Sequence, residues 1–236
     1  MRKIKYNEVR KQTKKDNQKE FESTYYFSHR FSNFFTYFFI NASITPNQIT
    51  GIFFLVGLLS CFLFLLQDYL SIICAFLLWR LHIILDLCDG EVARYSKSFS
   101  FNGAYWDYMI HSVLYPLCFI GISISLFNTF YNPNFLILAA IGSLAISVQH
   151  AIKNTYFRAL YSNKKYEELS SSLYKGSTFN KVIIELISFD YFIFIYVIFR
   201  LFEMNEFSFV LLLAIYVIFF ILFSMAKFIS FSNKNK

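Results

Sequence analysis

The residues that could do chemistry form two short clusters in an otherwise apolar chain of 236 residues. Asp86 is followed three positions later by Asp89, and Asp107 is followed four positions later by His111. Residues three or four positions apart lie on the same face of a helix, so each cluster presents two side chains together. Three carboxylates that meet at one place repel one another unless a cation lies between them. Oxygen ligands of this kind suit Mg²⁺ or Mn²⁺ better than Zn²⁺.

A helix cap is the ordinary explanation for one such Asp, but three carboxylates at these spacings favour a shared ion site. Gly90 and Gly103 accompany them and leave room for the backbone of a ligand to come close. Arg94 adds a planar positive fork that can hold phosphate. Carboxylates, glycines and an arginine together predict a diphosphate substrate that a metal ion can bridge.

The elements that carry these residues are predicted to be membrane-spanning helices. The chain is 56% hydrophobic, 22% aromatic and only 16% charged, which is typical of a polytopic membrane protein and excludes a disordered chain. Six stretches are long enough to cross about 30 Å of hydrocarbon: 49–67, 69–88, 104–127, 134–153, 182–202 and 207–227. All six should be helices, because lipid offers backbone groups no other partner, so the fold class is all-α. The longer links, 89–103 and 154–181, carry the polar residues.

The distribution of charge predicts which side of the membrane each link occupies. Nearly all of the 22 Lys and Arg residues lie at the two ends of the chain and in the two longer links. Positive residues favour the cytoplasmic side, so both termini are expected in the cytoplasm, with the protein in the cell membrane. The net charge of +7 is better explained by contact with membrane lipids than by nucleic acid, for which no binding is expected.

The N-terminal region is predicted to form two parts. Residues 1–20 should be a basic cytoplasmic tail, retained because they lack the apolar region of a signal peptide. Residues 21–236 should be the membrane domain. Its first segment, 21–41, is aromatic but broken by polar side chains, which predicts a helix along the inner interface. A helix packed across the cytoplasmic mouth of the bundle is the alternative.

The two clusters together resemble the signature of the CDP-alcohol phosphotransferases, also called CDP-alcohol phosphatidyltransferases. That signature reads Asp-x2-Asp-Gly-x2-Ala-Arg-x8-Gly-x3-Asp-x3-Asp. The matching residues are Asp86, Asp89, Gly90, Ala93, Arg94, Gly103 and Asp107, with His111 in the place of the last Asp. The stretch 44–50 (ITPNQIT) is similar to the family's segment that opens its first transmembrane helix. The resemblance covers roughly residues 30–230, leaving the basic tail outside it.

The resemblance implies a membrane transferase of phospholipid biosynthesis, expected to be a homodimer. Members of the family transfer a phosphate-linked group from a CDP-linked alcohol, usually CDP-diacylglycerol, to an acceptor hydroxyl and release CMP. By resemblance, Asp86, Asp89 and Asp107 bind Mg²⁺ or Mn²⁺. A further set is implied to hold the CDP group: Pro46, Asn47, Gly90, Arg94, Ser100 and Gly103.

His111 is the departure from the family pattern. The family's last Asp is assigned as the general base, and a neutral imidazole can accept a hydroxyl proton in its place. Imidazole is a poorer partner for Mg²⁺ than a carboxylate, so a second metal position should be weaker. Two other roles for His111 stay open. It could be a ligand that favours Mn²⁺, or it could mark a relative that binds CDP-alcohol and metal without turnover.

Other polar residues permit further interpretations. Intramembrane carboxylates also mark ion paths, but here they are predicted at one surface and no repeated halves are evident, which disfavours a transporter. Four residues near the predicted inner mouth could line a pocket for a small polar or phosphorylated acceptor: His150, Lys153, Arg158 and Glu185. The preference of Lys and Arg for the cytoplasmic side of a membrane also explains the positive residues among these four without an acceptor pocket. His82 is expected to be a core histidine.

Overall fold

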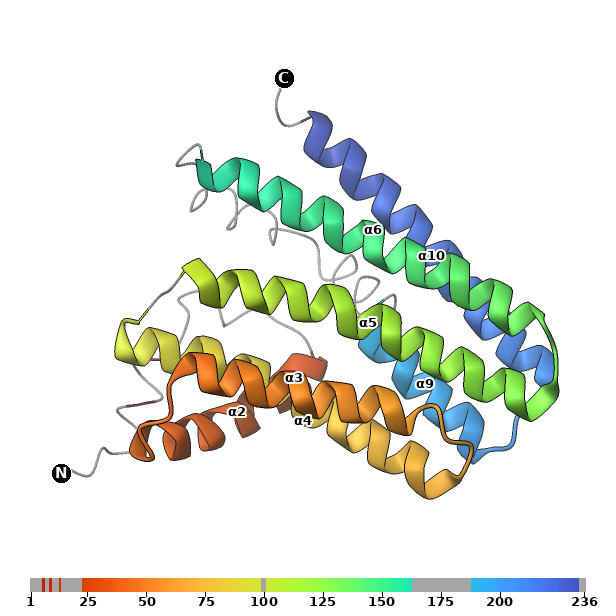
Figure 1. Ribbon diagram of the computed structural model, residues 1–236, viewed down its shortest axis with the longest axis horizontal. Coiled ribbons are helices and arrows are strands. Elements are labelled where there is room, and N and C mark those ends of the chain that lie inside the picture. Colours follow the sequence, from red (N-terminus) through yellow and green to blue (C-terminus); the bar gives the residue numbers. More distant parts are fainter. Residues whose placement is uncertain are drawn as a thin grey trace. The chain divides into compact units, whose positions relative to one another are not determined.

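The computed structural model describes residues 6, 9, 13, 23–98, 101–162 and 188–233, and every element within these ranges is a helix (Figure 1). The helices are α2 (Ser23–Asn41), α3 (Pro46–Leu63), α4 (Tyr69–Ser96), α5 (Phe101–Phe130), α6 (Asn134–Ser162), α9 (Phe189–Leu201) and α10 (Glu206–Asn233). The prediction of an all-α fold is therefore confirmed.

Five of these helices contain a segment that is long and apolar enough to cross a membrane. The segments are Pro46–Leu63, Tyr69–Ser96, Tyr105–Phe130, Asn134–Ile152 and Glu206–Ala226. They correspond to five of the six predicted stretches, and five such helices in one chain indicate a multi-pass membrane protein. Within the remaining stretch, 182–202, the structure describes helix α9. It has 13 residues, fewer than the roughly 20 that a spanning helix needs. The count of six therefore stays a prediction.

The helices extend beyond the predicted apolar stretches. Helix α4 continues to Ser96 and α5 begins at Phe101, so most of the predicted link 89–103 is helical. Helix α6 likewise continues to Ser162. Hydropathy locates the edge of the hydrocarbon, whereas a helix ends where its backbone is capped. Helix α4 ends at Ser96. The next residue, Lys97, has φ 53°, and the amide of Ser98 donates to the carbonyl of Ala93 at 3.1 Å.

Helix α3 begins with a capping box in the stretch that resembled the family segment. The side chain of Gln48 accepts from the backbone amide of Thr45 at 2.9 Å and from its hydroxyl at 3.1 Å. Pro46 follows as the first residue of the helix, where its missing N–H costs nothing. The stretch 44–50 therefore fixes the point at which α3 starts.

The predicted helix over 21–41 corresponds to α2, which spans Ser23–Asn41. Ser43 follows it with φ 56°, and the amide of Ile44 donates to the carbonyl of Phe39 at 2.9 Å. This closure ends α2 two residues before α3 is capped. Whether α2 lies at the membrane interface stays a prediction.

The chain divides into two compact units, of which the first comprises residues 1–60 and 74–110. His82 lies fully buried in the core of this unit. Its Nδ1 is 2.9 Å from the carbonyl oxygen of Phe53, and its ring packs on Phe53 and Trp79 with both centroid distances at 5.3 Å. The prediction of a core histidine is confirmed.

The second unit comprises residues 61–73 and 111–236. Tyr196 of α9 is fully buried there, with its ring centroid 6.0 Å from that of Phe64 and 6.2 Å from that of Phe209. Helices α5 and α6 approach closely at Gly142. A Cβ at this position would lie 2.2 Å from the ring of Phe119, so only glycine fits without a shift.

Candidate active site

Asp89 is held beside the first turn of α3. The hydroxyl of Thr50 lies 2.8 Å from the carboxylate Oδ2 of Asp89 and 3.0 Å from the carbonyl oxygen of Pro46. A hydroxyl has one hydrogen to donate, and an ionised carboxylate is the stronger acceptor of the two. Thr50 therefore fixes the orientation of Asp89 and links it to the segment that carries Pro46 and Asn47.

The three predicted carboxylates meet within the first unit. Asp89 interacts electrostatically with both Asp107 and Asp86. Asp86 and Asp107 each place a carboxylate oxygen within 4.8 Å of the other. Both side chains are half-buried, where the repulsion between like charges is screened less than in water. Helices α4 and α5 thus bring Asp86 and Asp107 close together, and their role as metal ligands stays a prediction.

His111 joins this cluster from the same helix as Asp107. One turn of α5 separates the two residues, and a ring nitrogen of His111 lies within 4.8 Å of the oxygens offered by Asp86 and Asp107. Two carboxylates and an imidazole at these separations fit a single divalent cation. Asp89, which the sequence placed among the ligands, is not part of this group of three.

Arg94 folds back over Gly90 on the next turn of α4. Its Nε donates to the backbone carbonyl of Thr13 at 3.0 Å. A Cβ at Gly90 would lie 3.3 Å from Nη1 of Arg94. The sequence suggested that Gly90 leaves room for a ligand, but in this structure the neighbour that occupies the space is the guanidinium itself.

Glu91 is a buried residue that the sequence reasoning missed. Its side chain is 2% exposed, and its two carboxylate oxygens accept from Ser32 at 2.8 Å and from Thr36 at 2.6 Å. Both hydroxyl residues are fully buried on α2. Their spacing of four residues within an aromatic helix was the available signal, because it places two hydroxyls on one face. Glu91 therefore fastens α2 to α4 one residue after Gly90.

Tyr115 was also missed, although it follows His111 by one helical turn. Its ring centroid lies 5.3 Å from that of His111 and 5.2 Å from that of His150. It stacks on Phe189 of α9 at 5.0 Å with an interplanar angle of 12°. Tyr115 thus contacts both His111, which the sequence reasoning assigned to chemistry, and His150, which it assigned to the acceptor pocket.

The remaining predicted residues are placed as follows. Pro46 is half-buried and Asn47 is exposed, both in the first turn of α3, and Gly103 is half-buried in the first turn of α5. Ser100 and Glu185 lie outside the described residues, as do the side chains of Lys153 and Arg158.

Comparison with known proteins identifies the family. The family model for CDP-alcohol phosphatidyltransferases matches residues 43–226. A bifunctional IPC transferase and DIPP synthase from Archaeoglobus fulgidus is 47% identical to this chain over 64 residues. That stretch covers 27% of the chain and 12% of the relative, so only a small part of the relative's length is matched. On the strength of the family match over most of its length, the chain belongs to the CDP-alcohol phosphatidyltransferase family.

Proposed function

We propose that this protein transfers a phosphatidyl or other substituted phosphate group from CDP-diacylglycerol to an acceptor hydroxyl and releases CMP, as a step of phospholipid biosynthesis. The observation that carries this proposal is the meeting of Asp86, Asp107 and His111 within 4.8 Å, in a chain that matches the family over residues 43–226. Four further signature residues lie on the same helix as Asp86: Asp89, Gly90, Ala93 and Arg94.

Asp86 and Asp107 would hold a divalent metal, with His111 as the third protein ligand or, alternatively, Asp89. When bound, the metal would bridge the diphosphate and neutralise the charge that develops on the departing CMP. The carboxylates suit Mg²⁺ and Mn²⁺ equally, whereas an imidazole ligand would favour Mn²⁺. Thr50 would keep Asp89 in one orientation whether that carboxylate binds the metal directly or through water.

The nucleotide would be held by residues from the first turns of α3 and α5 and from the end of α4. Six residues are implied by the family resemblance to hold the CDP group: Pro46, Asn47, Gly90, Arg94, Ser100 and Gly103. Arg94 would offer its guanidinium to the phosphate oxygens. The first turn of α3 adds backbone N–H groups at the positive end of a helix, which favours a negatively charged ligand.

The acceptor would be activated by His111, if the imidazole is not taken up as a ligand. Its ring nitrogen would take the hydroxyl proton while the acceptor oxygen forms a bond to phosphorus and the bond from phosphorus to the CMP oxygen breaks. Tyr115 packs against the His111 ring and would limit its rotation. His150, whose ring also packs against that of Tyr115, would face a small polar or phosphorylated acceptor.

The test is CMP release by the purified protein in lipid, measured with CDP-diacylglycerol, Mg²⁺ or Mn²⁺, and a panel of acceptors that includes glycerol phosphate and inositol phosphate. We expect release that depends on the metal and on one acceptor, and that Asp107→Asn abolishes. Binding of CDP and metal without CMP release from any acceptor would instead identify a relative that binds CDP-alcohol without turnover. Such a result would overturn the proposed transfer.

A further inference from the structure

The three described residues of the N-terminal tail lie on one helical face, on which Val9 and Thr13 are buried and Tyr6 is exposed. Tyr6, Val9 and Thr13 have helical backbone, and their spacing of three and four residues puts them on one side. Val9 and Thr13 are each 1% exposed. The Thr13 hydroxyl donates to the carbonyl of Val9 at 2.9 Å, one turn back. This burial is unexpected for a basic tail that the sequence reasoning placed outside the membrane domain.

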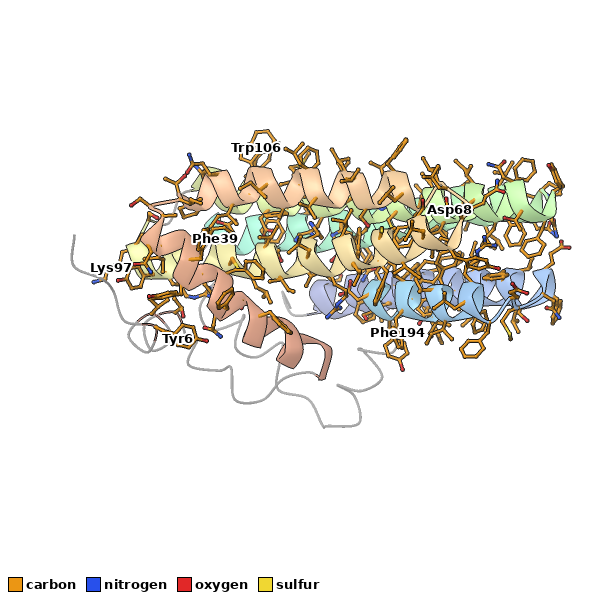
Figure 2. The ribbon with its side chains drawn as sticks, turned by 90° about the horizontal axis from the view of Figure 1, so that it is seen from below. Tyr6, Phe39, Asp68, Lys97, Trp106 and Phe194 are labelled. Carbon is orange, nitrogen blue, oxygen red and sulfur yellow. The ribbon has the colours of Figure 1, made fainter. Side chains whose placement is uncertain are left out.

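The tail face docks on the unit that carries the signature helix. The ring of Tyr6 meets that of Tyr37 of α2 edge to face, with centroids 5.8 Å apart. Figure 2 shows Tyr6 below α2 and, within the first unit, on the same side as Lys97, which follows the last residue of α4. Residues 1–60 and 74–110 belong to one compact unit, so the tail, α2 and the end of α4 are parts of a single body.

The consequence for the site lies in the contact with Arg94. The carbonyl of Thr13 accepts from Nε, the donor nearest the stem of the arginine, at 3.0 Å. A guanidinium has five N–H donors in one plane, so a bond to Nε fixes that plane and leaves the four donors of Nη1 and Nη2 for other partners. Nη1 lies beside Gly90, the signature residue that follows Asp89. The arginine is half-buried and interacts electrostatically with Glu91.

We propose that the N-terminal tail is a positioning element of the nucleotide site: the Thr13 carbonyl orients the Arg94 guanidinium so that its two terminal nitrogens face the diphosphate of a CDP-linked donor. The proposal rests on the proposed function, because it names how one residue of that site is held. A guanidinium already fixed in the binding orientation loses less conformational freedom when phosphate binds, which raises affinity for the nucleotide. Thr13 contributes through its backbone, so it is a positioning residue and not a catalytic one.

The experiment compares two truncations of the full chain. Removing residues 1–5 keeps the face of Tyr6, Val9 and Thr13, whereas removing residues 1–13 deletes it. Equilibrium binding of CDP, measured by calorimetry with Mn²⁺ present, should be unchanged in the shorter truncation and weakened about tenfold in the longer one. The KM for CDP-diacylglycerol should rise in parallel, with kcat at saturating donor staying within about twofold of the full chain.

Point variants separate positioning from general stability. Val9→Asp should undock the face and reproduce the loss of CDP affinity, while Val9→Ile should retain the affinity of the full chain. In an Arg94→Lys background, which lacks Nε, Val9→Asp should cause no further loss, because the two changes then remove the same contact. Thermal unfolding in detergent identifies variants that fail to fold. If a point variant fails to fold, the comparison of CDP affinity between the two truncations tests the proposal instead.

The outcomes are distinguishable from those that test the function. Full-length protein that binds no CDP would overturn the proposed function and this inference together. Full-length protein that binds CDP but does not turn it over would leave the binding comparison valid. Two results would overturn this inference alone. One is equal CDP affinity in the two truncations. The other is a Val9→Asp variant that loses as much CDP affinity in the Arg94→Lys background as it does with Arg94 present.

Discussion

At the scale of single residues, His111 decides how this site differs from the family pattern. A carboxylate at its position would bring a fourth negative charge to the cluster of Asp86, Asp89 and Asp107. The imidazole instead contributes a neutral nitrogen within 4.8 Å of Asp86 and Asp107. It can bind a metal or accept a proton, and both roles need the ring to stay in one orientation. Tyr115, one turn further along α5, packs on that ring.

Replacing His111 should therefore test its role directly. His111→Ala should lower kcat by about 10²- to 10⁴-fold, the usual contribution of a positioned acid or base. His111→Asp should restore activity and shift the preference from Mn²⁺ towards Mg²⁺, because oxygen replaces nitrogen as the donor. Steady-state CMP release with each metal measures both effects. Tyr115→Phe keeps the ring contact and is the control. Full activity of His111→Ala would remove this residue from the mechanism.

Thr50 should matter through Asp89. Thr50→Val removes the hydroxyl 2.8 Å from Asp89 Oδ2 without changing side-chain volume much, so the activating metal concentration should rise by about 10- to 100-fold. Thr50→Ser should restore the wild-type value. Ser60→Ala is a matched control on the same helix, because it removes a buried hydroxyl bond to the carbonyl of Ala75 in another part of α3. A Mn²⁺ titration that does not distinguish Thr50→Val from Ser60→Ala would contradict this role.

Gly90 should be sensitive to a single added methyl group. The new Cβ in Gly90→Ala would lie 3.3 Å from Nη1 of Arg94, so the guanidinium must shift by a few tenths of an ångström. We expect the KM for the CDP-linked donor to rise several-fold while the protein stays folded. Gly51→Ala is the matched control, since nothing lies within 4 Å of its Cβ and the helix gains about 1 kcal/mol in propensity. Equal donor KM values for the two variants would argue against the contact.

Which of these residues the sequence could predict depends on how far apart their partners lie along the chain. The spacing of Asp86 to Asp89 and of Asp107 to His111 follows from one turn of helix, so both pairs were predictable. Glu91 was missed because its partners on α2 lie 59 and 55 residues away. The stacking of Tyr115 on Phe189 depends likewise on a distant helix that no local pattern indicates.

At the scale of elements, the attachment of α2 to α4 depends on a buried carboxylate. The two carboxylate oxygens of Glu91 accept hydrogen bonds from Ser32 and Thr36. Removing one donor from a buried acceptor destabilises the fold by more than the net free energy of one hydrogen bond. The acceptor has then lost its hydrogen bonds to water and has no protein donor in their place. The end of α4, which carries Gly90 and Arg94, is therefore held in place by a helix that lies outside the residues matched by the family model.

Thr36→Val should accordingly lower the free energy of unfolding by about 1–3 kcal/mol, since it leaves one oxygen of Glu91 without its donor. Thr129→Val is the matched control. Its hydroxyl bonds at 2.8 Å to the carbonyl of Ser125 within α5, a contact that competes with the backbone ladder and adds little. Denaturant unfolding in detergent, followed by circular dichroism, measures both. A Thr36→Val variant as stable as Thr129→Val would mean that Glu91 finds another donor.

The ends of the elements were less predictable than their existence. Five apolar stretches correspond to helices because each is long enough to satisfy its own backbone in lipid. The polar continuation of α4 from Asp89 to Ser96 was read as a link, since hydropathy falls there. It is nevertheless helical, and this continuation places Arg94 one turn after Gly90. The site is thus built on helix where the sequence suggested a loop.

At the scale of the whole molecule, the distribution of charge leads to a prediction about sidedness. Helix α4 has 28 residues and rises about 1.5 Å per residue, or about 42 Å in all, which exceeds the roughly 30 Å of the hydrocarbon core. We therefore predict that its two ends face opposite sides of the membrane. Arg94 and Lys97 lie at the C-terminal end of α4, so that end is predicted to be cytoplasmic, and the Lys and Arg residues in the sequence of both termini predict the same side for them.

Cysteine labelling on intact cells tests this arrangement. Asp68→Cys and Lys97→Cys place thiols at exposed positions just before and just after α4, in a background where Cys74, the native cysteine that is not buried, is replaced by Ser. A membrane-impermeant maleimide should label Asp68→Cys in intact cells and Lys97→Cys only after the membrane is opened. The carboxylates proposed to bind the metal, Asp86 and Asp89, lie towards the Lys97 end of α4. The opposite labelling pattern would therefore move the proposed site to the outer surface, where a cytoplasmic supply of CDP-linked donor could not reach it.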